Sequence, residues 1–253
     1  MKTKLNNKSK EYNDNFYSQR YKDDWYVTLR VNDAKKLIKQ IQDINPFNKN
    51  DKVLDLGCGT GEAGAVIKNK FEARVYGIDI NSIAVEKARE NGLLAKIADI
   101  ETKWPYENNF FNSVVSTQMI EHLVNPDLFL QESKRVLNKK GLLIITTPNL
   151  AVWFNRIILM FGYQPFFTEV STIDKTLGLS FTRNLTPIRK PLGHLRCFTL
   201  KALKEILELH GFELVKVKGS AVNYFPWYIS IFDRFFSLFP SLASDLVVVA
   251  RKK

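Results

Sequence analysis

Residues 53–61 read Val-Leu-Asp-Leu-Gly-Cys-Gly-Thr-Gly, and this stretch decides the fold. Its first half is apolar except for one carboxylate, Asp55, and predicts a buried strand. Its second half is a tight turn with three glycines, Gly57, Gly59 and Gly61. A helix-compatible segment follows. Strand, glycine loop and helix in this order let a backbone come close to a nucleotide-like ligand.

The glycines allow two interpretations of the ligand. Glycine is needed here because a Cβ would block the turn or the approach of the ligand. The amides at the start of the next helix are then expected to point at an anionic group. Gly59 to Gly64 matches the G-x-G-x-x-G pattern of dinucleotide sites, but the frame D-x-G-x-G-x-G, from Asp55 to Gly61, is more specific. A tight turn that binds nothing is the purely structural alternative.

The composition indicates an ordinary globular protein. The chain has 253 residues, of which 45% are hydrophobic and 25% charged, which fits one large α/β domain with a core or a domain with insertions. It contains no apolar run of the ~18 residues that a membrane span needs. The polar N-terminus lacks an apolar signal core, so we expect a cytoplasmic location. Cys58 and Cys197 lie far apart and form neither a metal-type pair nor a disulfide framework.

The net charge of +11 leaves three kinds of partner open, namely nucleic acid, an anionic membrane or an anionic substrate. The basic residues are dispersed along the chain rather than grouped. No helix-turn-helix, zinc-finger or RNP-like pattern is present in the sequence. We therefore expect no nucleic-acid partner.

Short apolar runs alternate with helical patterns over the first 150 residues, which predicts βαβ units and a parallel sheet. The expected strands are 52–56, 73–79, 94–98, 112–117 and 141–147, and the expected helices between them are 61–71, 81–91 and 127–138. A helix is also expected within 24–44 and another at 199–210. Strands at 212–217 and 245–250 complete a seven-stranded sheet.

The predicted domain organisation is simple. Residues 1–15 are expected to form a disordered polar tail, and residues 16–253 a single domain. The βα pattern stops after Pro148. We therefore interpret 149–198 and 220–243 as inserted segments that form a lid.

Four further segments follow the glycine loop in a fixed order. They are Gly77-Ile78-Asp79-Ile80, Ala98-Asp99-Ile100, Ser116-Thr117-Gln118-Met119-Ile120-Glu121-His122, and Phe129 to Pro148. Together with the loop they resemble the class I S-adenosylmethionine (SAM) methyltransferases, of the type 11 or ubiquinone-type O-methyltransferase kind. The resemblance is firm over about residues 50–148 and looser over 193–253, and the order of the motifs is more specific than any one of them.

The resemblance implies a fold, a cofactor and a reaction. The fold is a Rossmann-like, seven-stranded, mostly parallel sheet with helices on both faces and an inserted lid. The cofactor is SAM, and methyl transfer is expected to oxygen of a small-molecule or lipid-linked acceptor, glycan-like or quinone-like. The implied cofactor-binding residues are Asp55, Gly57, Cys58, Gly59, Gly61, Asp79, Ile80, Asp99, Ile100 and Gln118.

The resemblance also suggests roles for several of these residues. Asp55 and the glycine backbone hold the methionine end of SAM, and Asp79 accepts from the ribose hydroxyls. Asp99 contacts the adenine amino group. A dinucleotide dehydrogenase has no routine need for such a third acid, so Asp99 favours SAM. Gln118 lies beside the sulfonium and faces the acceptor.

The chain has three histidines, and two of them are candidates for catalysis. His122 follows the fourth strand at the edge where α/β sheets bind ligands, so it could act as a general base or orient the acceptor. His194 lies in the inserted region and could close over the acceptor. His210 precedes Gly211 at a helix end and fits a helix-dipole role. We expect no metal. The alternative is that a carboxylate and a histidine near the acceptor bind Mg²⁺.

Two apolar, aromatic-rich segments, 150–167 and 224–240, stand outside the core pattern. Each is too short to span a bilayer. They could form a lid over an apolar acceptor, or a patch that contacts an anionic membrane with the help of the positive charge. A small extra core or a homo-oligomer interface is the alternative.

Three rival functions remain open. An NAD(P)-dependent oxidoreductase needs a second βαβ half, which the irregular segment after 148 disfavours. A non-catalytic SAM-binding or membrane-associated scaffold is compatible with the same loop and acids. A tRNA or rRNA methyltransferase is disfavoured because the Asn-Pro-Pro-aromatic motif of amino-group methylation is not found.

Overall fold

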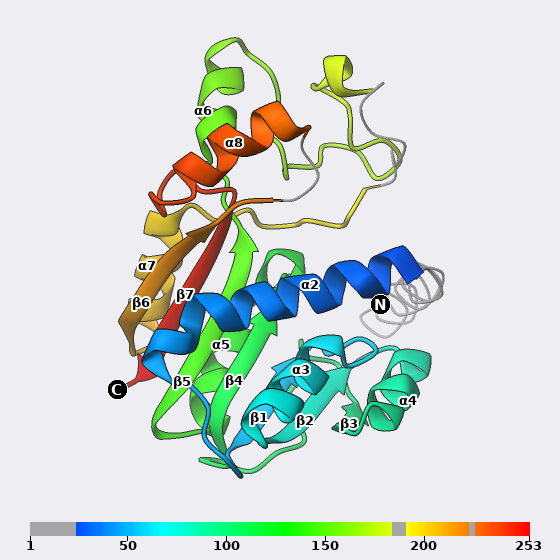
Figure 1. Cartoon of the computed structure of the whole chain (residues 1–253), viewed down its shortest axis with the longest axis vertical. Coiled ribbons are helices and arrows are strands. Elements are labelled where there is room, and N and C mark those ends of the chain that lie inside the picture. The colour runs from blue at the N-terminus through cyan, green and yellow to red at the C-terminus, as the bar shows by residue number, and fades with distance from the viewer. Residues whose placement is uncertain (1–23, 184–190, 223–225) are drawn as a thin grey trace, which may run out of the picture. The chain divides into compact units, whose positions relative to one another are not determined.

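The computed structural model of the chain describes residues 24–183, 191–222 and 226–253 (Figure 1). It contains one seven-stranded sheet in the order β3-β2-β1-β4-β5-β7-β6. The strands are β1 (Lys52–Leu56), β2 (Arg74–Asp79), β3 (Leu94–Ile97), β4 (Phe111–Thr117), β5 (Leu137–Pro148), β6 (Phe212–Ser220) and β7 (Asp245–Lys252). The predicted seven-stranded α/β fold is confirmed. The predicted tail, residues 1–15, lies outside the described residues, as do small parts of the two predicted lid segments.

Seven α-helices and three short 3-10 helices accompany the sheet in the described part of the chain. The α-helices are α2 (Asp24–Ile41), α3 (Glu62–Phe71), α4 (Ser82–Glu90), α5 (Pro126–Val136), α6 (Trp153–Met160), α7 (Leu200–Leu209) and α8 (Trp227–Phe236). The 3-10 helices are η1 (Gln42–Ile44), η2 (Ile120–His122) and η3 (Ser180–Thr182). Among these residues, no helix has the length and apolarity needed to cross a membrane.

The chain divides into two compact units. The first comprises the residues up to Thr117, with Gln131–Ile144 and Lys252–Lys253, and the second comprises Gln118–Leu130 and Ile145–Arg251. The first unit therefore holds the glycine loop and the first four strands. The second holds the end of β5, strands β6 and β7, and helices α6, α7 and α8.

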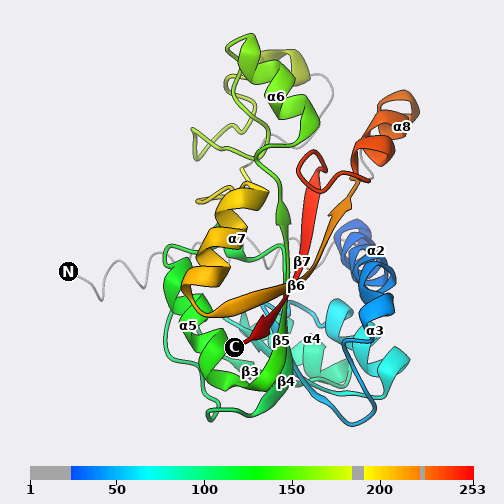
Figure 2. The same cartoon turned by 90° about the vertical axis from the view of Figure 1, so that its left-hand side faces the viewer.

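The parallel strands of the first unit are built around β1. It pairs in parallel with β2 on one side and β4 on the other, so that Asp55 lies opposite Gly77 and Val115. Strand β2 pairs in parallel with β3. Four of the five residues of β1 are buried, as expected for a central parallel strand whose two faces are both covered. Figure 2 shows α2 and α3 together on one side of these strands.

The second unit anchors its helices through buried polar groups. The carboxylate of Asp233, on α8, is fully buried and accepts hydrogen bonds from the Trp153 indole (3.1 Å), the Val222 amide (2.8 Å) and the Ser244 hydroxyl (2.5 Å). The Trp153 and Phe236 rings stack with centroids 5.2 Å apart. These contacts hold the start of α6 against the end of α8. Figure 2 shows the two helices diverging from there.

Most predicted elements appear within two residues of their expected bounds. Side chains cap two of these helices at their N-termini, because the Asn81 side chain accepts from the Ala84 amide at 2.9 Å and Thr199 accepts from the Ala202 amide at 3.2 Å. One boundary was wrong. The strand expected to begin at residue 141, after a helix over 127–138, already begins at Leu137, directly after the helix ends at Val136. Lys140, which lies inside β5, adopts a left-handed backbone with a φ of 62°.

Candidate functional site

The glycine loop of the first unit has the tight geometry that its sequence predicts. Gly57, Gly59 and Gly61 all have positive φ, at 64°, 53° and 87°. At Gly61, a Cβ would also lie 3.0 Å from the Cα of Ala88 on α4. The loop turns back on itself, since the Gly61 amide donates to the Cys58 carbonyl at 2.9 Å. Only glycine fits this turn without backbone strain.

Cys58 lies in the middle of the loop and fastens it to β2. Its side chain is fully buried, and its amide donates to the Ile78 carbonyl at 3.0 Å. A Cβ on Gly77 would lie 2.7 Å from the Cys58 sulfur, so the close approach of loop and strand requires glycine at position 77. Cys58 is therefore part of the loop's support as well as a predicted cofactor-site residue.

Asp79, at the end of β2, is bound to the same loop. One of its carboxylate oxygens accepts from the Gly59 amide and the other from the Asn81 amide, both at 2.9 Å. Two loop amides are therefore bound within the protein. The Gly59 amide donates to the Asp79 carboxylate, and the Gly61 amide donates to the loop carbonyl of Cys58.

Three buried acids surround the loop. Asp55, Glu62 and Asp79 are 1%, 5% and 8% exposed. One carboxylate oxygen of Glu62 accepts from the Thr60 hydroxyl, while its other oxygen, Oε2, has no hydrogen-bond partner among the described residues. A buried carboxylate oxygen without a partner is costly. The loop is thus suited to a ligand that brings positive charge and hydroxyl donors, and it would repel a pyrophosphate.

The remaining predicted cofactor residues of the first unit follow β2 and β3. Ile80 is partly exposed and comes directly after β2. Asp99 starts a turn, in which its carboxylate accepts from the Glu101 amide at 2.9 Å and its carbonyl from the Thr102 hydroxyl at 2.8 Å. Ile100 is buried, and its carbonyl accepts from the Trp104 indole at 3.0 Å.

Gln118 begins the second unit and has an unusual backbone. Its φ is 52°, in the left-handed region that a non-glycine residue rarely adopts. Its amide donates to the carbonyl of Thr146 at 3.0 Å. Residues held in such conformations cluster at functional sites, where the surrounding structure enforces them. The strain comes directly after β4, in the segment that the family resemblance predicts to face the acceptor.

Both predicted catalytic histidines lie together in the second unit. The ring centroids of His122 and His194 are 5.0 Å apart although the residues are far apart in the sequence. Glu121 joins them, with one carboxylate oxygen 3.9 Å from the His122 Nε2 atom. The possible ligand atoms of these three residues all lie within 4.8 Å of one another. We call Glu121, His122 and His194 the Glu-His-His cluster.

Backbone carbonyls fix the orientation of both imidazoles. The Nδ1 atom of His122 lies 3.0 Å from the Gly193 carbonyl, and that of His194 lies 2.9 Å from the Phe167 carbonyl. A carbonyl oxygen can only accept, so each Nδ1 carries a proton. In the neutral ring the lone pair is then on Nε2. The structure thus assigns the same tautomer to both histidines.

Glu121 and Glu169 hold the cluster in place through hydrogen bonds to the neighbouring backbone. The backbone carbonyl of Glu121 accepts from the amides of Leu195 and Arg196, at 2.8 and 3.0 Å, which ties η2 to the segment that carries His194. Its side chain is 1% exposed and accepts from the Thr147 hydroxyl at 3.0 Å. The Glu169 carboxylate accepts from the amides of residues 192, 193 and 194, at 2.5, 2.7 and 3.1 Å.

Sequence reasoning did not assign roles to Glu62, Glu121, Thr147 or Glu169. Glu121 stands next to the predicted His122, and an acid directly after a strand was the available signal. Glu62 follows the last loop glycine at the start of α3, and its place next to the glycine motif was the available signal. Glu169 and Thr147 become visible only when the chain is folded, because their partners are 20 or more residues away.

Comparison with known proteins identifies the family. Residues 47–168 match a protein family described as a methyltransferase domain, a range that includes the loop, the three acids and His122. Over these residues the chain is a class I SAM-dependent methyltransferase domain. It is an enzyme of that family, and SAM is the family's cofactor.

Individual relatives show how far the similarity extends. An uncharacterized protein of Methanocaldococcus jannaschii is 25% identical over 96% of this chain and 90% of its own length. The phosphoethanolamine N-methyltransferase of Plasmodium falciparum is 36% identical over 45% of this chain and 43% of its own. A ubiquinone biosynthesis O-methyltransferase of Neisseria meningitidis is 27% identical over 44% and 54%. The chain thus spans about half the length of these two named methyltransferases.

Solved structures confirm the fold. A Haloferax volcanii protein, solved in complex with the Trm112 methyltransferase activator, superposes with a TM-score of 0.64 at 16% identity and covers 94% of this chain and 97% of its own. A SAM-dependent methyltransferase of Methanosarcina mazei gives a TM-score of 0.59 at 18% identity, covering 82% and 95%. At these identities the likeness concerns the fold alone.

The buried acids of the first unit fit SAM. The cofactor carries an ammonium and a sulfonium, which suit Asp55 and Glu62, and a ribose diol, which suits Asp79. A carboxylate offers about four acceptor positions, so the two backbone contacts of Asp79 are compatible with bonds from ribose hydroxyls. The partnerless Oε2 of Glu62 is the structural observation that most directly calls for a cationic ligand.

Proposed function

We propose that this methyltransferase transfers the methyl group of SAM to an oxygen of a small or lipid-linked acceptor. The observation that carries this proposal is the Glu-His-His cluster, in which Glu121 and His122 follow β4 in the sequence and two oriented imidazoles lie together. An alcohol or phenol must lose a proton when its oxygen takes up the methyl group. Named relatives include both N- and O-methyltransferases, so the oxygen assignment comes from this chemistry.

The residues divide the work between binding and proton transfer. Asp55, Asp79, Asp99 and the loop glycines bind SAM, with Cys58, Ile80 and Ile100 lining that site and Gln118 beside the sulfonium. The sulfonium supplies the activated methyl group. The acceptor oxygen forms its bond to that methyl as the bond from sulfur breaks. The Nε2 atom of His122 or His194 accepts the acceptor's proton and later releases it to solvent.

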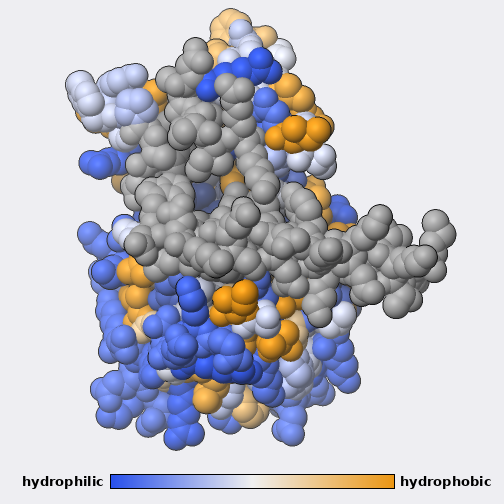
Figure 3. Space-filling view, turned by 90° about the vertical axis from the view of Figure 1, so that its right-hand side faces the viewer, coloured by the Kyte–Doolittle hydropathy of each residue, from blue (hydrophilic) through white to orange (hydrophobic). Residues whose placement is uncertain are grey.

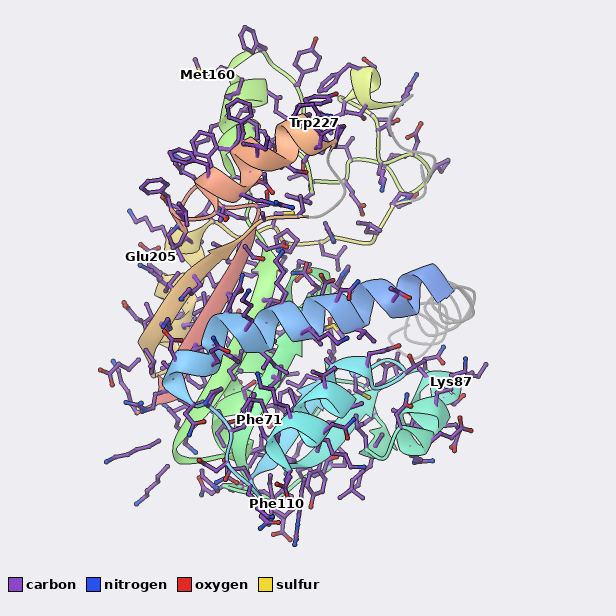
Figure 4. All side chains as sticks on the ribbon, viewed as in Figure 1. Phe71, Lys87, Phe110, Met160, Glu205 and Trp227 are labelled. Atoms are coloured by element: carbon purple, nitrogen blue, oxygen red, sulfur yellow. The ribbon has the colours of Figure 1, made fainter. Side chains whose placement is uncertain are left out.

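An apolar acceptor is supported by the surface of α6 and α8. Met160, Phe161 and Trp227 are 84%, 74% and 77% exposed. Figure 4 shows Met160 on α6 and Trp227 on α8, and Figure 3 shows apolar side chains at the surface of the second unit, at the top of that view. Exposed aromatic helix faces with nearby basic residues are typical of proteins that bind a membrane surface. We infer that the acceptor is lipid-linked and is met at an anionic membrane surface.

Calorimetric titration tests the cofactor assignment. Wild-type protein is titrated with SAM, S-adenosylhomocysteine and NADH, with Asp79→Ala measured alongside. We expect micromolar binding of SAM and S-adenosylhomocysteine, loss of both in the variant, and no heat with NADH. Asp79→Asn serves as a second variant, because it keeps the size of the side chain, whereas Asp79→Ala also frees the amides of Gly59 and Asn81. Binding of NADH but not SAM would contradict the proposal.

A turnover assay tests the chemistry. Transfer of labelled methyl from SAM is measured with phenolic, quinol-like and lipid-linked glycan acceptors, and with primary amines as the competing class. His122→Ala and His194→Ala should lower kcat with oxygen acceptors while SAM affinity stays unchanged. The matched control is His210→Ala, because His210 lies outside the cluster and pairs with Asp127 at 2.8 Å. Methylation of amines only, unaffected by both histidine variants, would contradict the proposal.

A further inference from the structure

We infer that the Glu-His-His cluster is a binding site for one divalent transition-metal ion, such as Zn²⁺, Mn²⁺ or Fe²⁺. The inference deepens the proposed function, because it rests on the acceptor being activated at this cluster. Three observations carry it, namely the convergence of the ligand atoms, the orientation of the imidazoles and the burial of Glu121.

The first observation is that the possible ligand atoms of the three side chains converge. A carboxylate oxygen of Glu121 and a ring nitrogen of each histidine lie within 4.8 Å of one another. The three side chains come from two segments of the second unit, η2 and the irregular stretch around residue 194. One metal ion with bonds of about 2.0–2.2 Å bridges atoms separated by roughly 3–3.5 Å, so small side-chain rotations complete the site.

The orientation of the imidazoles is the second observation. Metal-binding histidines almost always donate their other ring N–H to a carbonyl or a carboxylate. Here both Nδ1–H groups donate to backbone carbonyls, of Gly193 and Phe167. In both rings Nε2 is therefore the nitrogen whose lone pair is available to bind a metal ion. The Glu169 carboxylate in turn fixes the amides of residues 192–194, so the support extends one layer further out.

The burial of Glu121 is the third observation. Its side chain is 1% exposed, and burying a carboxylate is costly unless charge and hydrogen bonds compensate it. Thr147 donates one hydrogen bond to Oε2, whereas Oε1 faces the His122 ring at 3.9 Å. A divalent cation at this place adds positive charge beside the buried carboxylate.

The ligand types select the metal. Two imidazoles and one carboxylate favour Zn²⁺, Fe²⁺, Co²⁺ or Mn²⁺, whereas Mg²⁺ prefers oxygen ligands and retains water. Three protein ligands leave positions open for a substrate oxygen. A hydroxyl bound there loses its proton to solvent more readily, since a divalent metal lowers the pKa of a bound hydroxyl. In the metal-bound form the two imidazoles are ligands, and the cation replaces them in activating the acceptor.

Metal titration tests the inference without an activity assay. The full-length protein is stripped with a chelator, dialysed and titrated calorimetrically with ZnCl2, MnCl2 and MgCl2, and CoCl2 is added to record the visible spectrum. We expect one equivalent of Zn²⁺ to bind at micromolar affinity or better and Mg²⁺ to bind at least about tenfold more weakly. Bound Co²⁺ should give absorption bands of a site with nitrogen and oxygen ligands.

Matched variants assign the site. His122→Ala, His194→Ala and Glu121→Gln should each weaken Zn²⁺ binding by at least about tenfold and alter the Co²⁺ spectrum. His210→Ala removes the third histidine and should leave both unchanged. Circular dichroism and SAM titration check that each variant is folded. Glu169→Gln should weaken Zn²⁺ binding less than loss of a ligand, because it only loosens the support of His194.

Two results would overturn the inference. One is the absence of stoichiometric Zn²⁺ and Co²⁺ binding to wild type, and the other is binding that His210→Ala removes or that the three cluster variants retain. Either result leaves the proposed methyl transfer standing if the stripped enzyme still turns over. Metal binding at the cluster without methyl transfer to any oxygen acceptor would instead retain the inference and reject the proposed function.

Discussion

At the scale of single residues, the cofactor loop depends on where its negative charges are buried. Glu62 was not assigned by sequence reasoning, yet its buried Oε2 atom has no partner in the described part of the chain. Asp79, which the sequence did predict, is engaged twice by the backbone. The two acids therefore differ in role. Asp79 shapes the loop as well as the site, whereas Glu62 supplies charge.

Substitution of Glu62 by glutamine separates these roles. Glu62→Gln should weaken the binding of SAM and of S-adenosylhomocysteine by a similar factor, about tenfold, because both carry the ammonium group that a carboxylate attracts. The stability of the ligand-free protein should hold or rise, since the variant removes a buried charge. Calorimetry and thermal melts measure the two effects. A loss confined to SAM would assign Glu62 to the sulfonium instead.

Cys197 gives a second prediction at this scale. Burial is the main cause that raises the pKa of the Cys197 thiol to about 12, and the nearby carboxylates of Glu121 and Glu169 raise it further in the same direction. The thiol instead donates to the Phe167 carbonyl at 2.9 Å. At pH 8 about one molecule in ten thousand then carries the reactive thiolate. Iodoacetamide should leave Cys197 unmodified in the native protein and label it in urea, as peptide mass spectrometry can show. Rapid native labelling would contradict this.

At the scale of elements, an ion pair fastens the loop before β4 to α5. The Glu132 carboxylate receives two bonds from the Arg135 guanidinium, at 2.6 and 2.8 Å, and one from the Trp104 amide at 2.7 Å. The same guanidinium donates to the carbonyls of Trp104 and Tyr106. Burial opposes the ionisation of Glu132, but these bonds outweigh it and hold its pKa below the usual value of 4.5.

The stability that this ion pair contributes should depend on pH. A depressed carboxyl pKa stabilises the fold above the unfolded value and loses that effect as pH falls through the folded value. Glu132→Gln should therefore cost about 2 kcal/mol of unfolding free energy at pH 7, and the difference from wild type should shrink below about pH 4.5. Urea unfolding between pH 3 and 7 measures it. A difference that is constant with pH would show that packing, not charge, is responsible.

Elements in the first half of the chain were predictable because local signals agree there. The side chain of Asn81 caps α4, and β1 and β2 fall within one residue of prediction. The boundary between α5 and β5 was not predictable. Lys139, Lys140 and Gly141 carry a helix-stop signal, but the chain places them inside β5, with Lys140 left-handed. Sheet pairing, a long-range effect, outweighs the local signal.

The candidate site likewise contains residues that could be predicted from the sequence and residues that could not. The glycine loop and the acids after β2 and β3 could be assigned from sequence because each signal lies within a few residues. The pairing of His122 with His194 could not, since more than 70 residues separate them and the contact exists only in the folded second unit. Helices α6 and α8 were noticed as apolar segments, but the buried Asp233 that anchors α8 gives no local signal.

At the scale of the whole molecule, the net charge of +11 sets the response to salt. Like charges on a compact surface repel one another, and salt screens that repulsion within about 10 Å at 0.1 M. The melting temperature should therefore rise as NaCl increases from low concentration to about 0.2 M. Potassium chloride serves as a control for ion identity. A melting temperature that falls with salt would indicate that attractive ion pairs dominate instead.

The same charge acts together with the apolar surface of α6 and α8 in membrane binding. Between residues 149 and 198 the sequence has six basic residues, Arg156, Lys175, Arg183, Arg189, Lys190 and Arg196, and two acidic ones, Glu169 and Asp174. The protein should therefore float with vesicles that contain phosphatidylglycerol and remain unbound with phosphatidylcholine alone, because attraction to the surface adds to burial of the aromatic faces.

Paired substitutions test which surface is responsible. The double variant Met160→Ser and Trp227→Ser removes two apolar side chains from α6 and α8 and should lower vesicle binding by at least about tenfold, because each buried apolar side chain contributes roughly 1.5–3 kcal/mol. Leu209→Ser is the matched control, since Leu209 is also exposed, at 77%, but lies on α7. Equal loss in the control, or binding that survives the double variant and 0.5 M salt, would assign membrane contact to another surface. Retained SAM binding in the double variant would show that the cofactor loop of the first unit is intact.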